Sequence, residues 1–314
     1  MFEIRRYTQQ DEKAWNEFVG RSKNGTFLHL RTYMDYHSDR FADHSLIFSD
    51  DHGIYAMLPA NQVGDTIYSH QGLTYGGLIV DDRATVEGVR TLFTALNDYL
   101  SRLGIGKVVY KAIPWIYHRQ PSEEDLYAML NVCNARINVR HVSTTISLAS
   151  PIRWRRDHRY GANKAFTEGV IVERSDDFDA FWQILTGNLW QKYGARPVHT
   201  IEEIKLLHQR FPQNIRLYTA LKEGRTVGGT VLYLCGEVVH AQYISASEEG
   251  KRLHAVDALF RHILTEERWD AKFFDFGKSS DGDGHDLNTS LISQKEGFGG
   301  RAICYDWYEW ETTI

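Results

Sequence analysis

The sequence has only three cysteines, Cys133, Cys235 and Cys304, and they lie far apart in its 314 residues. Three widely separated thiols fit neither a disulfide framework nor the closely spaced ligands of a zinc site. The chain also lacks the run of about 18 apolar residues that would cross a bilayer, and its first residues alternate like a strand instead of forming an apolar signal segment. We therefore expect a cytoplasmic protein in a reducing compartment, with no membrane span and no metal site.

An excess of positive charge is absent as well. The chain has 36 Lys and Arg against 41 Asp and Glu, a formal net charge of -5, which excludes binding of nucleic acid through bulk charge and leaves only local basic patches. Hydrophobic residues at 42% and charged residues at 25% are ordinary globular values, so disorder is not expected. The length exceeds the usual single domain of about 100 to 150 residues, which favours two domains.

Motifs for covalent catalysis and for calcium are missing too. The sequence has no Gly-x-Ser-x-Gly elbow and no Cys-His pair with family spacing, so it does not indicate catalysis through a covalent enzyme intermediate. The acids of Asp281 to Asp286 alternate as in an EF-hand, but position twelve counted from Asp281 is Ile292, where a bidentate glutamate is needed. We interpret this segment as a flexible loop on the substrate side.

Hydrophobic periodicity and turn residues predict the same succession of elements twice. In the first half we expect a strand at 2–8, helices at 11–21 and 30–40, a three-strand meander at 45–48, 54–60 and 66–70, then a helix at 84–103, a strand at 107–113, a helix at 123–133 and a strand at 137–148. The second half repeats this order with a strand at 170–173, helices at 178–191 and 201–210, strands at 216–221, 226–234 and 238–245, then a helix at 253–264, a strand at 273–276, a helix at 287–294 and a strand at 303–310. The patterns predict an α/β protein with mixed sheets and two domains, 1–150 and 151–314.

This element order is that of the GNAT acyltransferase fold, and a tandem of two such units resembles the FemAB-like acyltransferases. The segment Arg159 to Val170 resembles the basic helix that leads into the second unit of that family. The late strand Phe274-Asp275-Phe276-Gly277 and the turn Lys295-Glu296-Gly297-Phe298-Gly299-Gly300 resemble its closing elements. The resemblance implies an acceptor side in the first domain and a donor and transfer site in the second.

The segment Ser247 to Ala255 departs from the coenzyme A pattern of GNAT enzymes. Acetyl-CoA users carry a glycine-rich loop whose backbone amides hold the pyrophosphate at a helix N-terminus, whereas this chain has one glycine, Gly250, followed by Lys251 and Arg252 and preceded by two acids. These three residues are the candidates for contact with a coenzyme. We expect no tightly bound cofactor, with acyl-CoA as a co-substrate. The long helical arm of some tRNA-using Fem enzymes is missing, so aminoacyl-tRNA is the second choice of donor.

A basic cluster precedes the second domain. Residues 153–164 carry five Arg and Lys against one acid, a composition that suits phosphate groups of a donor or acceptor and equally suits a solvated helix face. Arg159, Asn163 and Lys164 have spacings that place them on one helical face, so they are candidate substrate-binding residues.

The strand at 238–245 carries two catalytic candidates. Simple alternation places His240, Gln242 and Ile244 on one face, and Ala241, Tyr243 and Ser245 on the other. In GNAT folds this strand separates from the next one and exposes backbone N–H groups to the acyl carbonyl. His240 would accept the proton of the attacking amine and Tyr243 would protonate the leaving group. Each also fits a purely structural, hydrogen-bonded role.

The closing motif supplies the remaining candidates. Lys295 ends an apolar helix face of Leu287, Leu291 and Ile292, and the resemblance implies that it stabilises charge at the transfer site; a surface lysine is the alternative. Phe298 lies between glycines that permit tight backbone geometry. Asn288 and Asp275 are further substrate-binding candidates, although Asp275 also fits a capping or pairing role.

The resemblance implies an acyltransferase that acylates an amine of a cell-envelope precursor or amino sugar, in the manner of peptidoglycan-related enzymes. The expected partners are a small-molecule acyl donor and an amine acceptor; the sequence does not indicate the oligomeric state. The alternatives are an aminoacyl-tRNA-dependent transferase and a non-catalytic binding protein that has kept the fold but lost the pyrophosphate loop.

Overall fold

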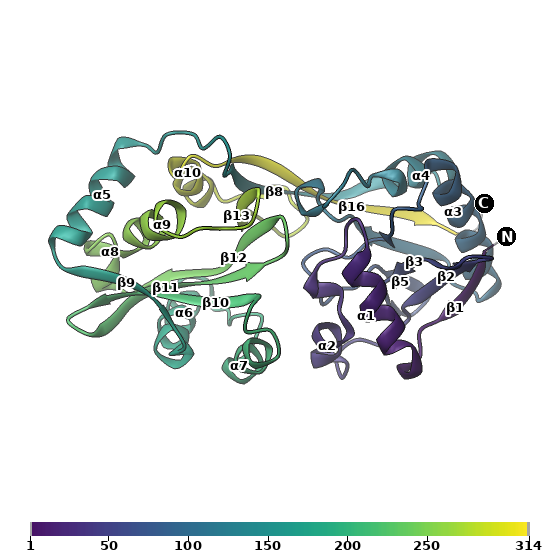
Figure 1. Cartoon of the computed structure of the whole chain (residues 1–314), viewed down its shortest axis with the longest axis horizontal. Coiled ribbons are helices and arrows are strands. Elements are labelled where there is room, and N and C mark those ends of the chain that lie inside the picture. The colour runs from purple at the N-terminus through teal and green to yellow at the C-terminus, as the bar shows by residue number, and fades with distance from the viewer. Residues whose placement is uncertain (1, 313–314) are drawn as a thin grey trace. The chain divides into compact units, whose positions relative to one another are not determined.

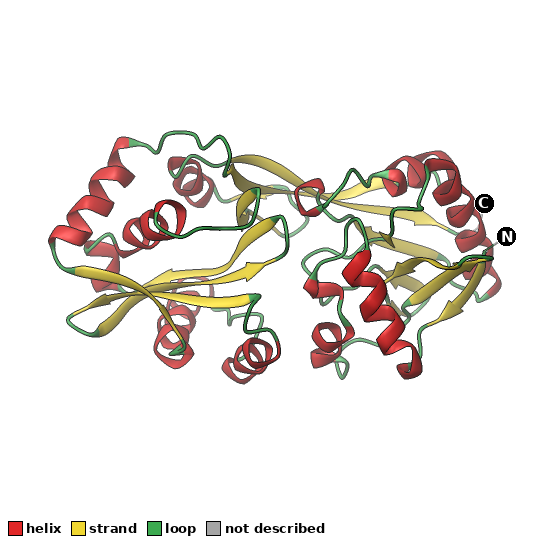
Figure 2. Cartoon of the chain, in the orientation of Figure 1, coloured by secondary structure: helices red, strands yellow, loops and turns green. Residues whose placement is uncertain are grey.

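The computed structural model describes residues 2–312 and divides the chain into two compact units. Unit 1 consists of residues 1–142, 280–287 and 304–314, and unit 2 of residues 143–279 and 288–303. Both are α/β units in which helices pack on mixed sheets (Figures 1 and 2). Within the described residues, none of the helices has the length and apolar character required to span a membrane.

Unit 1 contains two sheets rather than the expected continuous meander. Its helices are α1 (Glu12–Arg21), α2 (Arg31–Met34), α3 (Val86–Arg102) and α4 (Glu124–Val132). One sheet has the order β1-β2-β3-β6, made by Glu3–Arg6, Leu46–Asp50, Gly53–Leu58 and Ile79–Val80. The second contains β4 (Asn61–Val63), β5 (Thr66–Tyr68), β7 (Lys107–Lys111) and the late strand β16 (Arg301–Glu311). The predicted meander was wrong at its third strand, because β5 pairs in parallel with β7 while β6 takes the place beside β3.

The long amphipathic helix of unit 1 is confirmed. Thr85 caps α3 by accepting a hydrogen bond from the Gly88 backbone, and the apolar residues spaced three and four apart are buried in the core of the unit. The helix expected at 30–40 is shorter than predicted. It consists of α2 followed by a single 3-10 turn at Asp35–His37.

Unit 2 is built on one sheet with the order β8-β13-β12-β11-β10-β9. These strands are β8 (Arg136–Ser147), β13 (Phe273–Lys278), β12 (Val238–Ala246), β11 (Arg225–Leu234), β10 (Ile215–Lys222) and β9 (Val170–Ser175). Helices α6 (Phe178–Tyr193) and α7 (Ile201–Arg210) lie on one face, and α5 (Arg156–Thr167) and α9 (Ala255–Thr265) lie on the other (Figure 1). The short α8 (Glu248–Arg252) precedes α9, and α10 (Thr289–Gly297) precedes the final strand.

The edge strand of each unit comes from the other half of the sequence. Ser143–Ser147 of β8 pair with β13 in unit 2, and Trp307–Glu311 of β16 pair with β7 in unit 1. The structure therefore divides the chain after residue 142 and returns its end to unit 1, whereas the sequence places one boundary at 150/151. The reason is that strand pairing is non-local, so the order of elements cannot show which sheet a terminal strand joins.

The loop at residues 281–286 is also more ordered than expected. Its ends form a two-stranded hairpin, β14 (Ser280–Asp281) with β15 (Asp286–Leu287), assigned to unit 1. Gly284 has a positive φ of 89° and lies so close to the Arg140 backbone that a Cβ would collide with it. Among the described residues no group of acids, histidines and cysteines is arranged to hold a metal ion.

We predict that Gly250→Ala destabilises unit 2. An added Cβ at Gly250 would lie 2.0 Å from the Val227 carbonyl oxygen, a backbone atom of β11 that cannot move aside. We expect the free energy of unfolding to fall by about 1 to 3 kcal/mol, the usual cost of overpacking, measured by urea denaturation. Gly187→Ala is the matched control, because nothing lies within 4 Å of the position that its Cβ would take and the change should stabilise α6 by about 0.5 to 1 kcal/mol. Equal effects of the two substitutions would contradict the tight packing of α8.

Candidate functional site

The central feature of unit 2 is the point at which β12 and β13 stop pairing. The parallel register joins Val238 to Phe273, Val239 to Phe274 and His240 to Asp275, and it ends there. Strand β12 continues to Ala246, paired with β11 on its other side. Backbone groups of β12 that point toward β13 beyond His240 are therefore left without a strand partner in β13 and remain available to a ligand.

A β-bulge lies just beyond this point. Opposite β11, Leu232 pairs with Ala241 and Val231 with Tyr243, so Gln242 is an extra residue. Directly opposed residues share a face of the sheet, and Tyr233 and Val231 lie two residues apart, so their partners His240 and Tyr243 lie on the same face. The prediction from simple alternation, which placed His240 and Tyr243 on opposite faces, was wrong because it assumed an unbroken period of two.

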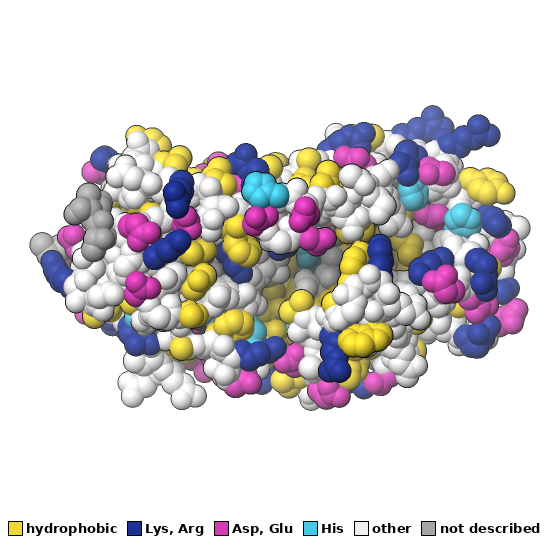
Figure 3. All heavy atoms as spheres, turned by 180° about the vertical axis from the view of Figure 1, so that it is seen from behind, with side chains coloured by type: hydrophobic (Ala, Val, Ile, Leu, Met, Phe, Trp, Pro, Cys, Tyr) yellow, Lys and Arg dark blue, Asp and Glu magenta, His cyan; other side chains and the backbone are white. Residues whose placement is uncertain are grey.

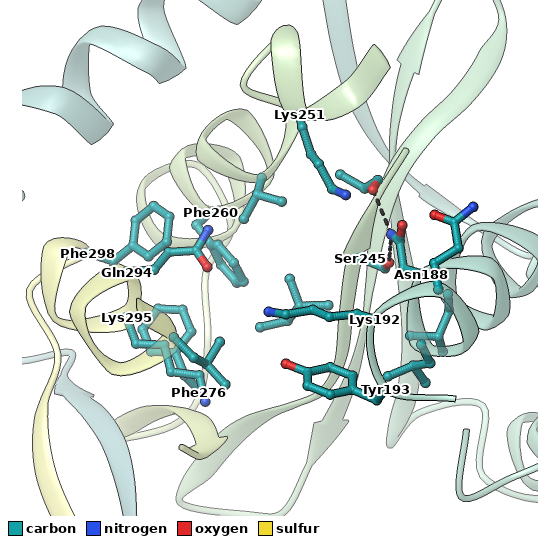
Figure 4. A pocket seen from close by; sticks show the side chains of 17 residues that line it. Asn188, Lys192, Tyr193, Ser245, Lys251, Phe260, Phe276, Gln294, Lys295 and Phe298 are labelled. Carbon is teal, nitrogen blue, oxygen red and sulfur yellow. Dashed lines mark hydrogen bonds between the residues drawn. The ribbon is translucent and has the colours of Figure 1, made fainter. Parts of the chain in front are cut away.

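A cavity of about 500 Å³ adjoins the separated part of β12. Its lining comes entirely from unit 2, and the labelled side chains converge on it from α6, β12, α8, α9, β13 and α10 (Figure 4). The volume is within the usual range of small-molecule sites, about 300 to 1,000 Å³. Of the residues predicted from the sequence, Lys295, Lys251 and Phe298 line this cavity.

The two walls of the cavity differ in chemistry. One wall is apolar and is formed by Val256, Phe260, Phe276, Leu291 and Phe298. The other carries polar groups of Asn188, Lys192, Tyr193, Ser245 and Lys251. The Asn188 side-chain amide donates to the Ser245 hydroxyl at 2.7 Å and to the Ala246 carbonyl at 2.8 Å, which joins α6 to the end of β12 (Figure 4).

The last turn of α6 presents the exposed side chains of Gln191, Lys192 and Tyr193 to the cavity. Gly194 ends the helix in the left-handed conformation, with φ 61°. Lys192 and Tyr193 stand just before it and line the cavity. The Tyr193 hydroxyl also accepts a long hydrogen bond of 3.4 Å from the Asn288 amide, so the N-terminus of α10 lies beside the end of α6.

Asp275 is fully buried at the base of the opening. Its carboxylate accepts hydrogen bonds from the Ser143 hydroxyl at 2.6 Å, the Thr145 hydroxyl at 2.7 Å and His240 Nδ1 at 2.8 Å. Burial alone would raise its pKa, but the hydrogen bonds and charge of His240, with the two hydroxyls, outweigh this and lower the pKa to about 2. The carboxylate is therefore ionised at neutral pH and fixes the orientation of the imidazole ring.

Lys295 is buried and lies within α10, which extends further than the predicted 287–294. Its ammonium donates to the carbonyls of Gly277 and Lys278 at 2.8 and 2.9 Å, and to the Ser279 hydroxyl at 2.9 Å. Burial lowers its pKa to about 8, partly offset by the charge of Asp275. The expected apolar helix face was wrong at Leu287, which lies in β15 and is exposed. Lys295 thus holds the end of β13 as well as lining the cavity.

Tyr243 is held by a residue that the sequence did not single out. Its hydroxyl lies 2.6 Å from His199 Nδ1, and its ring packs edge-on against Trp182 of α6. Burial raises the pKa of Tyr243 to about 12, so the phenol stays protonated at neutral pH. Neither Tyr243 nor His240 is among the cavity-lining side chains; both lie on the α6 face of β12 beside the opening.

The basic helix α5 lies apart from the cavity. Arg159, Asn163 and Lys164 all belong to α5, where Lys164 faces Glu168 at 3.7 Å and none of the three lines the cavity. In Figure 3, Lys and Arg side chains gather over the part of unit 2 that carries the start of α5. Arg155, Arg156, Asp157 and Tyr160 line a separate shallow depression there.

Gly250 and Lys251, which the sequence marked as candidates for contact with a coenzyme, form hydrogen bonds and an ion pair within their own turn. The Gly250 backbone N–H donates to the Ser247 hydroxyl and the Lys251 N–H to the Ser247 carbonyl. The Lys251 ammonium pairs with Glu248. Arg252 ends α8, and the first turn of α9 contains Asp257, a carboxylate that binds His158 and His254. An internal acid thus occupies the helix terminus that would otherwise attract a pyrophosphate.

The glycines around Phe298 permit the tight backbone geometry that the sequence predicted. Gly299 has a positive φ of 90°, and a Cβ at Gly297 would lie 2.4 Å from the His158 ring. Phe298 packs on Trp154, His158, Phe260 and Phe276 and is almost completely buried.

Asn288 caps α10 by accepting a hydrogen bond from the Leu291 backbone. The polar side chains Asn188, Lys192 and Gln294 were missed, because isolated residues on exposed helix turns carry no motif.

We predict that Asp275→Asn destabilises the protein in a pH-dependent way. The folded-state pKa of about 2 is below the usual 3.8, so the carboxylate contributes stability above pH 3.8 that is lost as the pH falls through 2. We expect the substitution to lower the free energy of unfolding by about 2 kcal/mol at pH 7 and by less at pH 3, measured by urea titration. The exposed Asp281→Asn serves as control. A loss of equal size at both pH values would contradict this role.

Comparisons with known proteins agree with this geometry. Residues 153–283 match the family model described as an acetyltransferase (GNAT) domain. A search of curated protein sequences finds no match. Among solved structures, FemX is similar over 98% of this chain and 97% of its own, with 11% identity and a TM-score of 0.69. L-PGS from Bacillus licheniformis is similar over 96% and 91%, with 12% identity and a TM-score of 0.62.

A third similar structure is a tandem GNAT protein from the clavulanic acid biosynthesis pathway, which covers 100% of this chain and 99% of its own with 11% identity and a TM-score of 0.52. Identities this low establish the fold and not the reaction. The matched domain contains β12, β13 and most of the cavity wall, and the similar structures extend over both units. Residues 153–283 therefore carry a GNAT acetyltransferase domain, and the chain as a whole has a tandem GNAT fold similar to that of FemX.

Proposed function

We propose that this protein is an N-acyltransferase whose donor binds in the cavity of unit 2. The observation that carries the proposal is the end of the β12–β13 pairing at His240 and Asp275, beside a cavity of about 500 Å³. An acyl carbonyl placed against β12 between Ala241 and Ala246 would meet backbone groups that have no partner in β13. Fixed donors of this kind stabilise the negative charge that develops on a carbonyl oxygen during acyl transfer.

The reaction that fits this site is direct transfer. A neutral amine attacks the acyl carbon, a carbon–nitrogen bond forms, the bond to the leaving sulfur or oxygen breaks, and the amine proton is passed to the leaving group. In our proposal His240 takes the amine proton, because Asp275 holds its Nδ1 side and orients the ring. Tyr243 supplies a proton to the leaving group, since its raised pKa keeps the phenol protonated. The proton held on His240 then returns to the Tyr243 phenolate through solvent, so that one proton in total passes from the amine to the leaving group.

Lys295 acts in this proposal as a positioning residue with a charge. Its three hydrogen bonds hold Gly277, Lys278 and Ser279, which end the strand opposite the open edge of β12. The ammonium also places a positive charge beside the cavity, where it would favour the tetrahedral intermediate.

The acceptor we propose is an amine of a cell-envelope precursor or amino sugar. Support comes from the similarity to FemX and to L-PGS and from the basic residues Arg155, Arg156 and Arg159 at α5, which suit phosphate groups of a nucleotide- or lipid-linked acceptor. Acyl-CoA or a related thioester is the proposed donor and aminoacyl-tRNA the alternative. A non-catalytic binding protein is favoured by one feature, the internally bonded turn at Ser247 to Lys251.

The proposal is tested by assaying the purified protein with acyl-CoAs and aminoacyl-tRNAs against amino sugars and nucleotide-linked amino sugars, with product detection by mass spectrometry. We expect Gln294→Trp to lower kcat/KM for the donor at least tenfold, because this exposed residue lines the cavity and an indole would fill it. Glu296→Trp is the matched control, since Glu296 is exposed on the same helix outside the cavity. Transfer that is unaffected by Gln294→Trp would place the donor elsewhere.

The charge on Lys295 gives a second prediction. With a pKa of about 8, its ammonium is present below pH 8 and is lost as the pH rises. We therefore expect kcat to fall above pH 8, and we expect this fall to shift upward by at least one pH unit in Lys295→Arg, because a guanidinium stays protonated. The pH profile separates a role of the charge from a purely structural one, which would lower kcat equally at all pH values. An unchanged alkaline limb in an active Lys295→Arg variant would exclude Lys295 as its source.

A further inference from the structure

The charged residues around the unit 2 cavity are all of one sign. Its lining contains three lysines, Lys192, Lys251 and Lys295, and no aspartate or glutamate among the residues that the structure describes. The three differ in their partners. Lys295 donates to the end of β13 and Lys251 pairs with Glu248. Lys192 forms no ion pair within residues 2–312 and points into the cavity (Figure 4).

The opposite wall offers no carboxylate to a second charge. It consists mainly of Val256, Phe260, Phe276, Leu291 and Phe298, side chains without polar atoms, and the uncharged amide of Gln294 lies beside them (Figure 4). The Lys295 ammonium beside them already donates three hydrogen bonds to the Gly277 and Lys278 carbonyls and the Ser279 hydroxyl. A ligand placed against this wall gains from apolar contact and loses if it brings an unpaired polar group.

The size of the cavity adds a second constraint. At about 500 Å³ it lies well inside the range of sites that enclose a drug-sized ligand, about 300 to 1,000 Å³. A two-carbon acyl group would leave most of the apolar wall in contact with water. A chain of several carbons would cover that wall.

We propose that the acyl group transferred by this protein is uncharged and carries an apolar chain of several carbons. An aminoacyl group, by contrast, carries an α-ammonium, which would meet Lys192 and no carboxylate in the described lining, so like charges disfavour it. Lys192 is thus a specificity residue that rejects cationic acyl groups. The inference rests on the proposed function, in which this cavity holds the donor.

The direct test compares three thioesters that differ only in the acyl group: acetyl-, hexanoyl- and 2-aminohexanoyl-pantetheine. Their dissociation constants are measured by isothermal titration calorimetry with the full chain at pH 7, where the α-ammonium is largely protonated. We expect hexanoyl-pantetheine to bind at least tenfold more tightly than either of the others. Comparison of hexanoyl- with acetyl-pantetheine tests the preference for chain length. Comparison of hexanoyl- with 2-aminohexanoyl-pantetheine tests the rejection of a positive charge.

Two variants assign the effects to named residues. Lys192→Glu supplies a carboxylate, so we expect it to shift the ratio of affinities at least tenfold toward 2-aminohexanoyl-pantetheine. Leu291→Trp narrows the cavity from its partly exposed rim and should weaken the binding of hexanoyl-pantetheine more than that of acetyl-pantetheine. Lys13→Glu is the charge-matched control, because Lys13 is an exposed residue of α1, and it should leave the ratio as in the unaltered protein.

The outcomes separate this inference from the proposed function. Binding of 2-aminohexanoyl-pantetheine as tight as that of hexanoyl overturns charge selection while keeping the cavity as the donor site. Equally tight binding of acetyl-pantetheine and hexanoyl-pantetheine overturns the preference for an apolar chain of several carbons. Failure of all three thioesters to bind at millimolar concentration overturns the inference and removes the cavity as a thioester site. Selective binding without transfer to any amine would leave the inference standing and contradict the enzymatic function.

Discussion

The candidate site depends on a buried carboxylate at the place where two strands separate. Asp275 stands in the last paired position of β13 and gathers His240, Ser143 and Thr145 around it. Because an ionised carboxylate without partners is costly to bury, this set of hydrogen bonds fixes three strands of unit 2 at one level. Beyond that level β12 and β13 diverge, and Lys295 holds the end of β13 in the diverged position. The cavity follows from this arrangement.

Much of the architecture is encoded in local patterns. The amphipathic helix α3, the basic helix α5 and the glycine turn after α10 agree with prediction, because periodicity, charge runs and glycines act over short distances. The exchange of the edge strands β8 and β16 between the two units could not be predicted, since pairing partners lie far apart in sequence. The same non-local pairing moved β5 out of the expected meander.

The site could be predicted from the sequence only in part, for a related reason. Lys295, Lys251 and Phe298 were found through motifs and do line the cavity, whereas Asn188 and Lys192 come from a helix whose sequence shows no motif. The bulge at Gln242 placed His240 and Tyr243 on one face, against the predicted alternation, because one extra residue reverses the phase of a strand. The helix α5, predicted to bind substrate, lies outside the cavity, and binding of an acceptor by its basic residues stays a proposal.

We expect a donor carbonyl to lie against the edge of β12 that does not pair with β13. The most direct measurement is a crystal structure of the protein with a ketone analogue of hexanoyl-pantetheine, in which a methylene replaces the thioester sulfur and no transfer can occur. We predict a carbonyl oxygen within hydrogen-bond distance of a backbone N–H between Ala241 and Ala246, with the chain against Phe260 and Phe276. An analogue bound with its carbonyl away from β12, or bound outside this cavity, would contradict the account.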